Sequence, residues 1–272
     1  MENFLAFFET MPAWQKLVWV FACLSVSWVL EGAVPLVTLN YKKWKHAGVN
    51  LIFLSTSLVI NLLFTIATAG VFIWGAQYEF GLLYWLDLPV WAELILAVML
   101  LDLVAQYVAH YLLHKVKWMW KFHLVHHSDT KVDATTGTRH HPGDYVIREV
   151  FALFGVIIFG IPLAFYLFYR IATILFTYLT HANITVPAWL DKPLSLLFIT
   201  PNMHKFHHHF ERPWTDSNYG NIFSLWDRMF GTFVYDDPRK VRYGVDVLSD
   251  DLDENVAYQF KVPFDKTIKT DY

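Results

Sequence analysis

Long apolar runs with few charges dominate the first half of the chain and indicate helices that cross a membrane. A helix needs about 20 apolar residues to span the roughly 30 Å hydrocarbon core of a bilayer. The run 13–36 contains only Lys16 and Glu31 as charged residues. The run 49–76 contains no charged residue, and a third run covers 90–108. We predict one membrane-spanning helix in each run.

A fourth apolar run, 145–179, is too long for a single span. Gly160 and Pro162 interrupt it, and both residue types break a continuous helix. We therefore predict a helical hairpin that enters the membrane and returns. Arg170 lies in the second arm. We expect its side chain to face protein or the interface, because a charge exposed to lipid is costly.

The composition agrees with a membrane environment. The chain is 56% hydrophobic and 17% charged, whereas soluble domains average about 25% charged. Aromatic residues, at 18%, are typical of membrane–water interfaces. The sequence predicts an all-α integral membrane protein with about four to five membrane-embedded helices. We expect N-terminal transmembrane helices over 1–98, a histidine-rich domain over 99–240 and a polar C-terminal tail over 241–272. A cytoplasmic helical cap is expected to hold the histidines.

Basic residues predict the orientation in the membrane, because Lys and Arg concentrate in cytoplasmic loops. The loop after the first span contains Lys42, Lys43 and Lys45, whereas the loop 77–89 contains neither Lys nor Arg. Residues after the third span are again basic, so we place them in the cytoplasm. The N-terminus has no basic region or cleavage signature, and the first span is expected to direct targeting. We expect a bacterial inner-membrane protein, with the endoplasmic reticulum as the alternative.

Charge and cysteine content exclude several classes of site. The net charge of −3 gives no reason to expect nucleic-acid binding. The single Cys23 excludes an intrachain disulfide and a Cys-rich metal site. No feature of the sequence specifies an oligomeric state.

Histidines carry the chemistry of this chain. The chain has 13 histidines. All except His46 lie between His110, at the end of the third span, and His209. His110 and His114 form H-x-x-x-H, a spacing that puts both side chains on one helical face. His181 stands alone at the end of the hairpin.

Two further groups read H-x-x-H-H, at 123–127 and 204–208. At about 100° per residue, the three histidines of each triplet point toward one side of a helix. His209 points away from that side, and we set it and His46 aside.

This histidine content indicates two metal ions. Clustered imidazoles repel one another when protonated, and metal binding keeps them neutral. A structural zinc ion takes four ligands, so the cluster suits two metals that keep positions open for a substrate or oxidant. Imidazole binds iron, zinc, copper and nickel, so the ligands alone do not select the metal. Four carboxylates lie near the histidine groups in the sequence, and we expect them to orient the metal ligands. They are Asp102, Asp129, Asp144 and Asp227.

Three functions fit such a site at a membrane surface. The first is redox chemistry on a lipid-soluble substrate. The second is a membrane-embedded zinc-dependent hydrolase that activates water, although the protease motif H-E-x-x-H and the G-x-S-x-G motif are absent. The third is a non-enzymatic metal transporter or sensor, which needs polar residues along the spans. The uncharged span 49–76 disfavours it.

The motifs resemble those of the fatty acid hydroxylase / sterol desaturase superfamily, a group of membrane histidine-box enzymes. HYLLH (110–114), HLVHH (123–127) and HKFHH (204–208) are similar to its three boxes, in order. RHHP (139–142) and THAN (180–183) are similar to its intermediate segments. NYGNIFSLWDRMFGTF (218–233) resembles its closing signature, and the resemblance covers about 100–235.

The resemblance implies a di-iron, O2-dependent oxidoreductase of lipid biosynthesis with its boxes facing the cytoplasm. Its metal-binding and catalytic roles fall on His110, His114, His123, His126, His127, His181, His204, His207 and His208. Two positions depart from the family pattern: Asp144 stands where many relatives have Glu, and Thr177 where a second late His is frequent. Any metal contact by His140 or His141 stays open.

The implied reaction is hydroxylation (by a monooxygenase) or desaturation of a C–H bond in a membrane lipid, such as a sterol, fatty acyl, alkyl or sphingoid lipid, held in an apolar cavity. Two external electrons are needed for each turnover. The chain has no flavin, nicotinamide or Cys-cluster motif, so we expect an electron-transfer protein or reductase as a partner. The Lys-rich stretch 115–121 either attracts such an acidic partner or faces solvent and lipid headgroups.

The closing segment also predicts a short helix. Its apolar face contains Ile222, Phe223, Leu225, Trp226, Met229 and Phe230. We place Asp227 and Arg228 on the polar side and expect Gly231 to end the helix. The apolar face either packs against the metal domain or lies on the membrane beside the substrate's path.

Overall fold

The computed structural model describes residues 1–269, which form helices, short turns and two isolated β-bridges, with no extended strand among them. The predicted all-α membrane fold is confirmed. The α-helices are α1 (Glu2–Glu9), α2 (Ala13–Ala33), α3 (Lys43–Tyr78), α4 (Val90–Leu101), α5 (Ala109–Lys115), α6 (Lys117–His127), α7 (Pro142–Phe159), α8 (Leu163–His181), α9 (Ala188–Leu194), α10 (Pro201–His207), α11 (Leu225–Met229) and α12 (Val256–Lys261).

Short segments of other helix types join these elements. The π-helical segment η2 (Asp102–Val108) connects α4 to α5 without a break. The remaining short turns are η1 (Leu82–Trp85), η3 (Ala134–Thr138), η4 (Trp214–Asp216), η5 (Pro238–Lys240), η6 (Asp250–Leu252) and η7 (Val262–Phe264).

Within the described residues, four helical stretches are long and apolar enough to cross a membrane. They are Ala13–Ala33, Lys43–Trp85, Val90–Lys115 and Leu163–His181. These contain or match the predicted spans, and the protein is therefore a membrane protein. The helix α7, the first arm of the predicted hairpin, is not among them, because three charged residues lie near its start.

The hairpin itself forms as predicted. The helix α7 ends before Gly160, whose φ of +63° is a left-handed conformation that favours glycine. Pro162 then precedes the first residue of α8. A Cβ atom on Gly81 would lie 2.1 Å from the backbone nitrogen of Gly160, so the loop after α3 packs directly on this turn.

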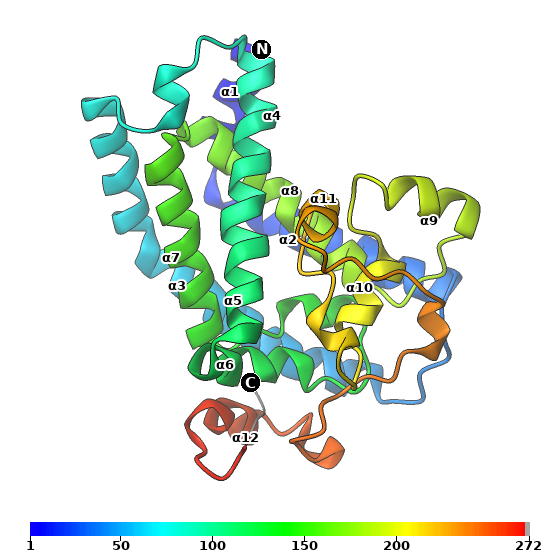
Figure 1. The fold of residues 1–272 in the computed structure, drawn as a ribbon. Helices are drawn as coiled ribbons and strands as arrows, with labels where there is room; N and C mark the ends of the chain where they lie inside the picture. Colours follow the sequence, from blue (N-terminus) through cyan, green and yellow to red (C-terminus); the bar gives the residue numbers. More distant parts are fainter. Residues whose placement is uncertain (270–272) are drawn as a thin grey trace.

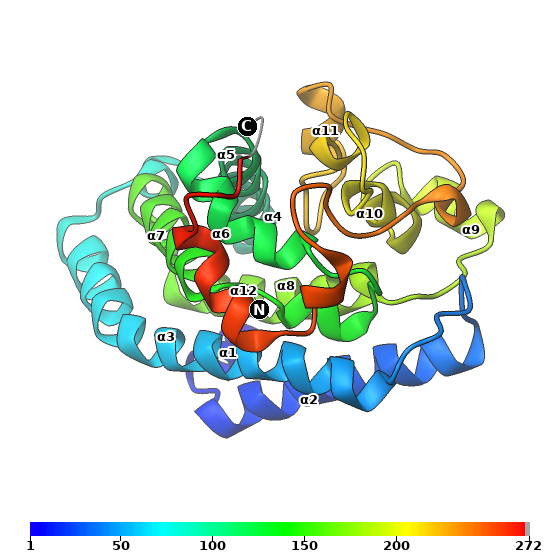
Figure 2. The same cartoon turned by 90° about the horizontal axis from the view of Figure 1, so that it is seen from below.

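The largest buried apolar cluster lies between α4, α7 and α8 and includes Leu101, Val156 and Phe165. In Figure 1, α7 lies between α3 and α4 and packs on both, and α9, α10 and α11 form a lobe beside them. A second cluster joins the C-terminal residues Val245 and Val262 to α6. Seen from below, α12 and the segment before it lie over α6 (Figure 2). The C-terminal segment therefore covers the helix that carries the second histidine triplet.

Candidate metal centre

The fold brings together all nine histidines that the sequence predicted as ligands. They form two buried groups, and within each group one nitrogen of every ring lies within 4.8 Å of the others. Group A is His110, His114, His123, His127 and His207. Group B is His126, His181, His204 and His208.

Each H-x-x-H-H triplet contributes to both groups. The helix α6 supplies His123 and His127 to group A and His126 to group B. Residues at α10 supply His207 to group A, and His204 and His208 to group B. Across the boundary, the rings of His127 and His208 stack with centroids 4.8 Å apart. The histidines of a triplet share one side of the helix, as predicted, and the approximately 100° step between neighbours divides them between two adjacent centres.

Backbone carbonyls fix the tautomer of three rings. The Nδ1 atom of His110 lies 2.8 Å from the carbonyl oxygen of Tyr219, and that of His207 lies 2.8 Å from Ser217 O. The Nδ1 atom of His181 lies 2.7 Å from Thr177 O. A carbonyl oxygen only accepts, so each Nδ1 carries the hydrogen and each Nε2 keeps a lone pair for a metal.

Ring nitrogens of neighbouring histidines also lie close to one another. The Nε2 atoms of His110 and His123 are 2.9 Å apart, and those of His181 and His204 are 3.0 Å apart. His123 Nδ1 is already bound to the Asp144 carboxylate at 2.8 Å. Facing lone pairs repel unless a cation lies beside both. Nitrogens each about 2.1 Å from one ion are roughly 3.0–3.4 Å apart at octahedral to tetrahedral angles, so this spacing fits metal binding.

Other buried ring nitrogens also indicate metal binding. His127 and His208 each bury both nitrogens without a hydrogen-bond partner among the described residues, and His126 and His204 each bury one such Nδ1. A buried polar atom without a partner costs about 1–3 kcal/mol. The donor set therefore fits two metal ions better than it fits a metal-free polar core.

Burial also keeps these imidazoles neutral. Desolvation lowers the pKa of His123 to about 3, although Asp144 opposes the shift. Desolvation and the neighbouring imidazoles hold the pKa of His126, His127 and His208 well below the ordinary value. Neutral imidazole is the form that binds a metal.

Of the four carboxylates proposed from the sequence, Asp144 contacts the cluster directly. It accepts hydrogen bonds from His123, from His140 Nδ1 at 2.9 Å and from Arg148 Nε at 2.9 Å. Burial raises the pKa of Asp144, but Arg148 and His123 outweigh this effect and hold the pKa well below its ordinary value. Asp129 lies 3.3 Å from His46, away from both groups.

The other two carboxylates, Asp102 and Asp227, accept hydrogen bonds from the closing segment (218–233). On η2, Asp102 accepts from the backbone N–H groups of Ile222 and Phe223 at 3.2 and 3.1 Å. Asp227 accepts from the N–H of Tyr219 at 2.8 Å. The prediction that Asp227 lies on a polar side was wrong, because its side chain is fully buried. These contacts hold the loop whose Tyr219 carbonyl orients His110.

The closing helix is shorter than the apolar pattern indicated. The structure forms α11 from Leu225–Met229, and Gly231 follows with a φ of +73°, as expected for a helix end. Trp226 packs inward, whereas Met229 and Phe230 are exposed. Part of the predicted apolar face thus packs on the metal domain, and the remainder faces outward.

The four histidines outside groups A and B have different surroundings. The ring of His140 stacks on His126 at 4.5 Å and forms a third possible ligand group with His123 and Asp144. His141 instead accepts a hydrogen bond from Gly143 N at the start of α7. His46 lies in the polar network around Asp129, and His209 accepts from the backbone of Glu211. His46 and His209 lie outside both groups.

Sequence reasoning missed two supporting side chains. Asp216 Oδ1 lies 3.4 Å from His114 Nδ1, although the two residues are far apart in sequence. Lys205, inside the third box, is fully buried and donates to the carbonyl oxygens of Thr180 and His181 at 3.1 and 2.5 Å. No sequence pattern marks Asp216, and Lys205 reads as an ordinary surface lysine.

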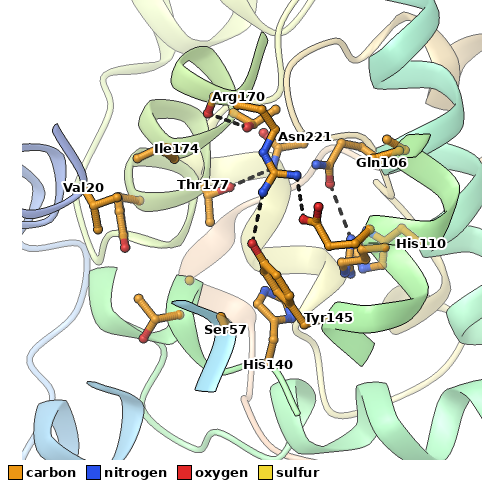
Figure 3. A pocket seen from close by; sticks show the side chains of 18 of the residues that line it. Val20, Ser57, Gln106, His110, His140, Tyr145, Arg170, Ile174, Thr177 and Asn221 are labelled. Carbon is orange, nitrogen blue, oxygen red and sulfur yellow. Dashed lines mark hydrogen bonds and ion pairs between the residues drawn. The ribbon is translucent and has the colours of Figure 1, made fainter. Parts of the chain in front are cut away.

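A cavity of about 200 Å³ borders the cluster. His126, His181 and His204 line it together with His110. Figure 3 shows this cavity with Tyr145 and Arg170 directed toward one another and with His110 and His140 beside it. Open space next to metal-facing imidazoles is where a substrate would meet the centre.

Comparison with known proteins identifies the family. A family model described as fatty acid hydroxylase matches residues 94–232, about half of the chain. The chain belongs to this family. The matched region includes both histidine groups and the closing segment.

The chain is also similar to characterised lipid-modifying enzymes. It is 32% identical to the ornithine lipid hydroxylase OlsE of Rhizobium tropici over 47% of this chain and 38% of that protein. It is 29% identical to human alkylglycerol monooxygenase over 82% of this chain and 46% of that protein. The Caenorhabditis elegans alkylglycerol monooxygenase is 31% identical over 48% of this chain and 26% of its own length. The matches thus span less than half the length of these relatives. No solved structure matches the chain significantly.

Proposed function

We propose that this protein is an O2-dependent di-iron monooxygenase that hydroxylates a C–H bond of a membrane lipid. The observation that carries the proposal is the pair of adjacent histidine groups, A and B, whose buried ring nitrogens lie close to one another beside a cavity. Family membership and relatives named as hydroxylases and monooxygenases favour hydroxylation over desaturation.

The overall reaction is R–H + O2 + 2 e⁻ + 2 H⁺ → R–OH + H2O. Two iron ions held by the nine histidines would supply the activation of O2 that an unactivated C–H bond requires. The protein's own residues hold the ligands and the substrate. Backbone carbonyls and Asp144 orient the imidazoles, and the apolar residues around the cavity exclude water.

The electrons come from an external donor in this proposal, an electron-transfer protein or reductase at the membrane. We place the histidine groups on the cytoplasmic side of a bacterial inner membrane on the basis of loop charge. The Lys-rich stretch 115–121 gives limited support for the docking of such a partner. Lys115 pairs with Asp216 at 2.6 Å and Lys121 donates to Asp265 O at 2.8 Å. Lys117 is the exposed lysine of the stretch that forms no such contact with the described residues.

Metal content and cellular lipids test the proposal. The purified protein is expected to bind two iron ions per chain and to consume O2 when a reductant and lipid are supplied. Cells that express the wild type should contain lipids with one added oxygen, and these should be absent with His126→Ala. His209→Ala is the matched control, because His209 lies next to the third box and outside both groups. A protein that retains only zinc and acts without O2 would instead support a hydrolase.

A further inference from the structure

The cavity beside the histidines has one strongly polar side. Asn61 on α3, Tyr145 and Glu149 on α7, and Arg170 on α8 line it, and we call these residues the polar wall. Apolar residues such as Val20, Leu58 and Ile174 line another part. The cavity is therefore amphipathic, in contrast to the apolar cavity expected from the sequence.

Hydrogen bonds fix the polar wall in one arrangement. Arg170 Nη1 donates to Glu149 Oε1 at 2.6 Å. Its Nη2 donates to Asn61 Oδ1 at 3.1 Å and to the hydroxyl oxygen of Tyr145 at 3.0 Å. Because Glu149 balances the charge of Arg170, the wall offers hydrogen bonds without a net charge.

Within the polar wall, the Tyr145 hydroxyl is a group whose hydrogen remains available to a ligand. Its oxygen accepts from Asn61 Nδ2 at 2.5 Å and from Arg170 at 3.0 Å, which fills both accepting positions. Its own hydrogen has no acceptor among the described residues, and the side chain borders the cavity. A hydrogen-bond donor inside a cavity is satisfied by an acceptor on the substrate.

Cavity size places this donor close to the reaction. A pocket that encloses a drug-sized ligand measures about 300–1,000 Å³, whereas this cavity measures about 200 Å³. Only a short part of a lipid fits inside. The atoms that contact Tyr145 and the atoms that face His126, His181 and His204 must therefore belong to the same short part.

We propose that the polar wall is a specificity site for an uncharged oxygen acceptor on the lipid, such as an ether, ester, amide or hydroxyl oxygen. The C–H bond that is oxidised then lies within a few bonds of that oxygen, and not in the middle or at the end of a hydrocarbon chain. This inference rests on the proposed hydroxylation, whose O2 and two electrons are balanced as above.

The test determines where the new oxygen is placed. Cells that express the wild type, Tyr145→Phe, Tyr166→Phe or His126→Ala are grown with 1-O-hexadecylglycerol. Tandem mass spectrometry then locates the added oxygen in this probe and in the cells' own lipids. Hexadecanal released from the probe counts as oxidation at the carbon next to the ether oxygen, because a hemiacetal formed there breaks into the aldehyde and glycerol. Tyr166→Phe is the matched control, because Tyr166 contacts Arg170 only at 3.5 Å and does not line the cavity.

We expect the oxygen within a few bonds of the polar linkage, and about tenfold less product with Tyr145→Phe than with Tyr166→Phe at equal protein and iron content, because a hydrogen bond to the substrate is lost. Mid-chain or terminal oxidation, or equal product from the two Tyr→Phe variants, would overturn the inference and leave the hydroxylase function intact. If the Tyr145→Phe protein does not accumulate in cells, the position of the added oxygen in the wild-type products still tests the inference. Equal lipids in wild-type and His126→Ala cells would refute the hydroxylase function itself.

Discussion

Individual side chains in this protein act mainly by orienting the imidazoles of groups A and B. Asp144 is the clearest case, because one carboxylate accepts hydrogen bonds from His123, His140 and Arg148. The Asp side chain is one methylene shorter than the Glu that many relatives have there. It reaches His123 because both residues are fully buried and their helices are packed together.

The substitution Asp144→Asn is expected to lower iron affinity about 10- to 100-fold, because an amide orients His123 less strongly than a carboxylate does. Iron retained during titration with a chelator measures the effect. Asp246→Asn, at an exposed position, serves as the control and should behave as the wild type. Unchanged iron retention in Asp144→Asn would mean that His123 needs no carboxylate partner.

The buried histidines also predict how stability depends on pH. Burial places the folded-state pKa of His123 at about 3, below the value of about 6.5 of an unfolded histidine. Below about pH 6.5 the unfolded chain therefore binds more protons, and stability falls as the pH decreases. Buried Asp227 opposes this trend, because burial raises its folded-state pKa to about 6. It is one group against several buried histidines whose pKa is lowered.

Thermal unfolding of the metal-free protein in detergent, measured between pH 8 and pH 5, tests this dependence. The melting temperature should decline most steeply below about pH 6.5. Buried Lys205, whose pKa burial lowers to about 7, adds a smaller decline between pH 8 and pH 7. His208→Asn removes one of the buried imidazoles and should make the decline shallower. A melting temperature that is the same at pH 8 and pH 5 would show that these rings are not neutral and buried.

At the scale of elements, the histidine site depends on the segments and contacts that connect one helix to another. The π-helical segment η2 joins α4 to α5 and carries Asp102, which holds the closing segment through its backbone N–H groups. Such segments often occur at functional sites. The helix α10 is fixed to the end of α8 by Lys205, whose ammonium group binds the carbonyls of Thr180 and His181. These carbonyls lie at a helix C-terminus, where a cation is stabilised.

Replacement of Lys205 by Met is expected to reduce the free energy of unfolding by about 1–3 kcal/mol, because two buried carbonyls lose a charged donor. The melting temperature should then fall by several degrees. Lys192→Met, at an exposed position on α9, is the control. Equal melting temperatures for the two variants would indicate that Lys205 does not hold α8 to α10.

At the scale of the whole molecule, the membrane helices and the histidine groups form one unit. Helices α3, α7 and α8 carry the polar wall, and the same cavity ends at histidines from α6, α8 and α10. The C-terminal segment packs on α6. A lipid in the cavity would thus contact the membrane region and the metal-facing residues together.

Loop charge predicts which side of the membrane holds this unit. An alkaline phosphatase fused after Asp87 should be active, because that loop is expected outside the cytoplasm, and a fusion after Lys131 should be inactive. A green fluorescent protein at the same two positions should give the opposite pattern. A phosphatase that is active only after Lys131 would reverse the orientation.

The sequence by itself determined the helical class, the membrane spans and the nine histidines, because each depends on local spacing. Apolar runs of about 20 residues with few charges favour spanning helices, and helical periodicity directs the histidines of a triplet to one side. These properties are present in any chain with that pattern, whatever lies beside it.

Only the tertiary structure decided how the histidines divide and what supports them. Their separation into groups A and B depends on how α5, α6, α8 and α10 pack. The partners Asp216 and Tyr219 O are distant in sequence from the rings they contact, and Ser217 O lies outside the helix that carries His207. Likewise, the polar wall exists because Asn61, Tyr145 and Arg170 meet from three helices. Contacts between distant segments leave no periodic pattern in the chain, so the fold had to reveal them.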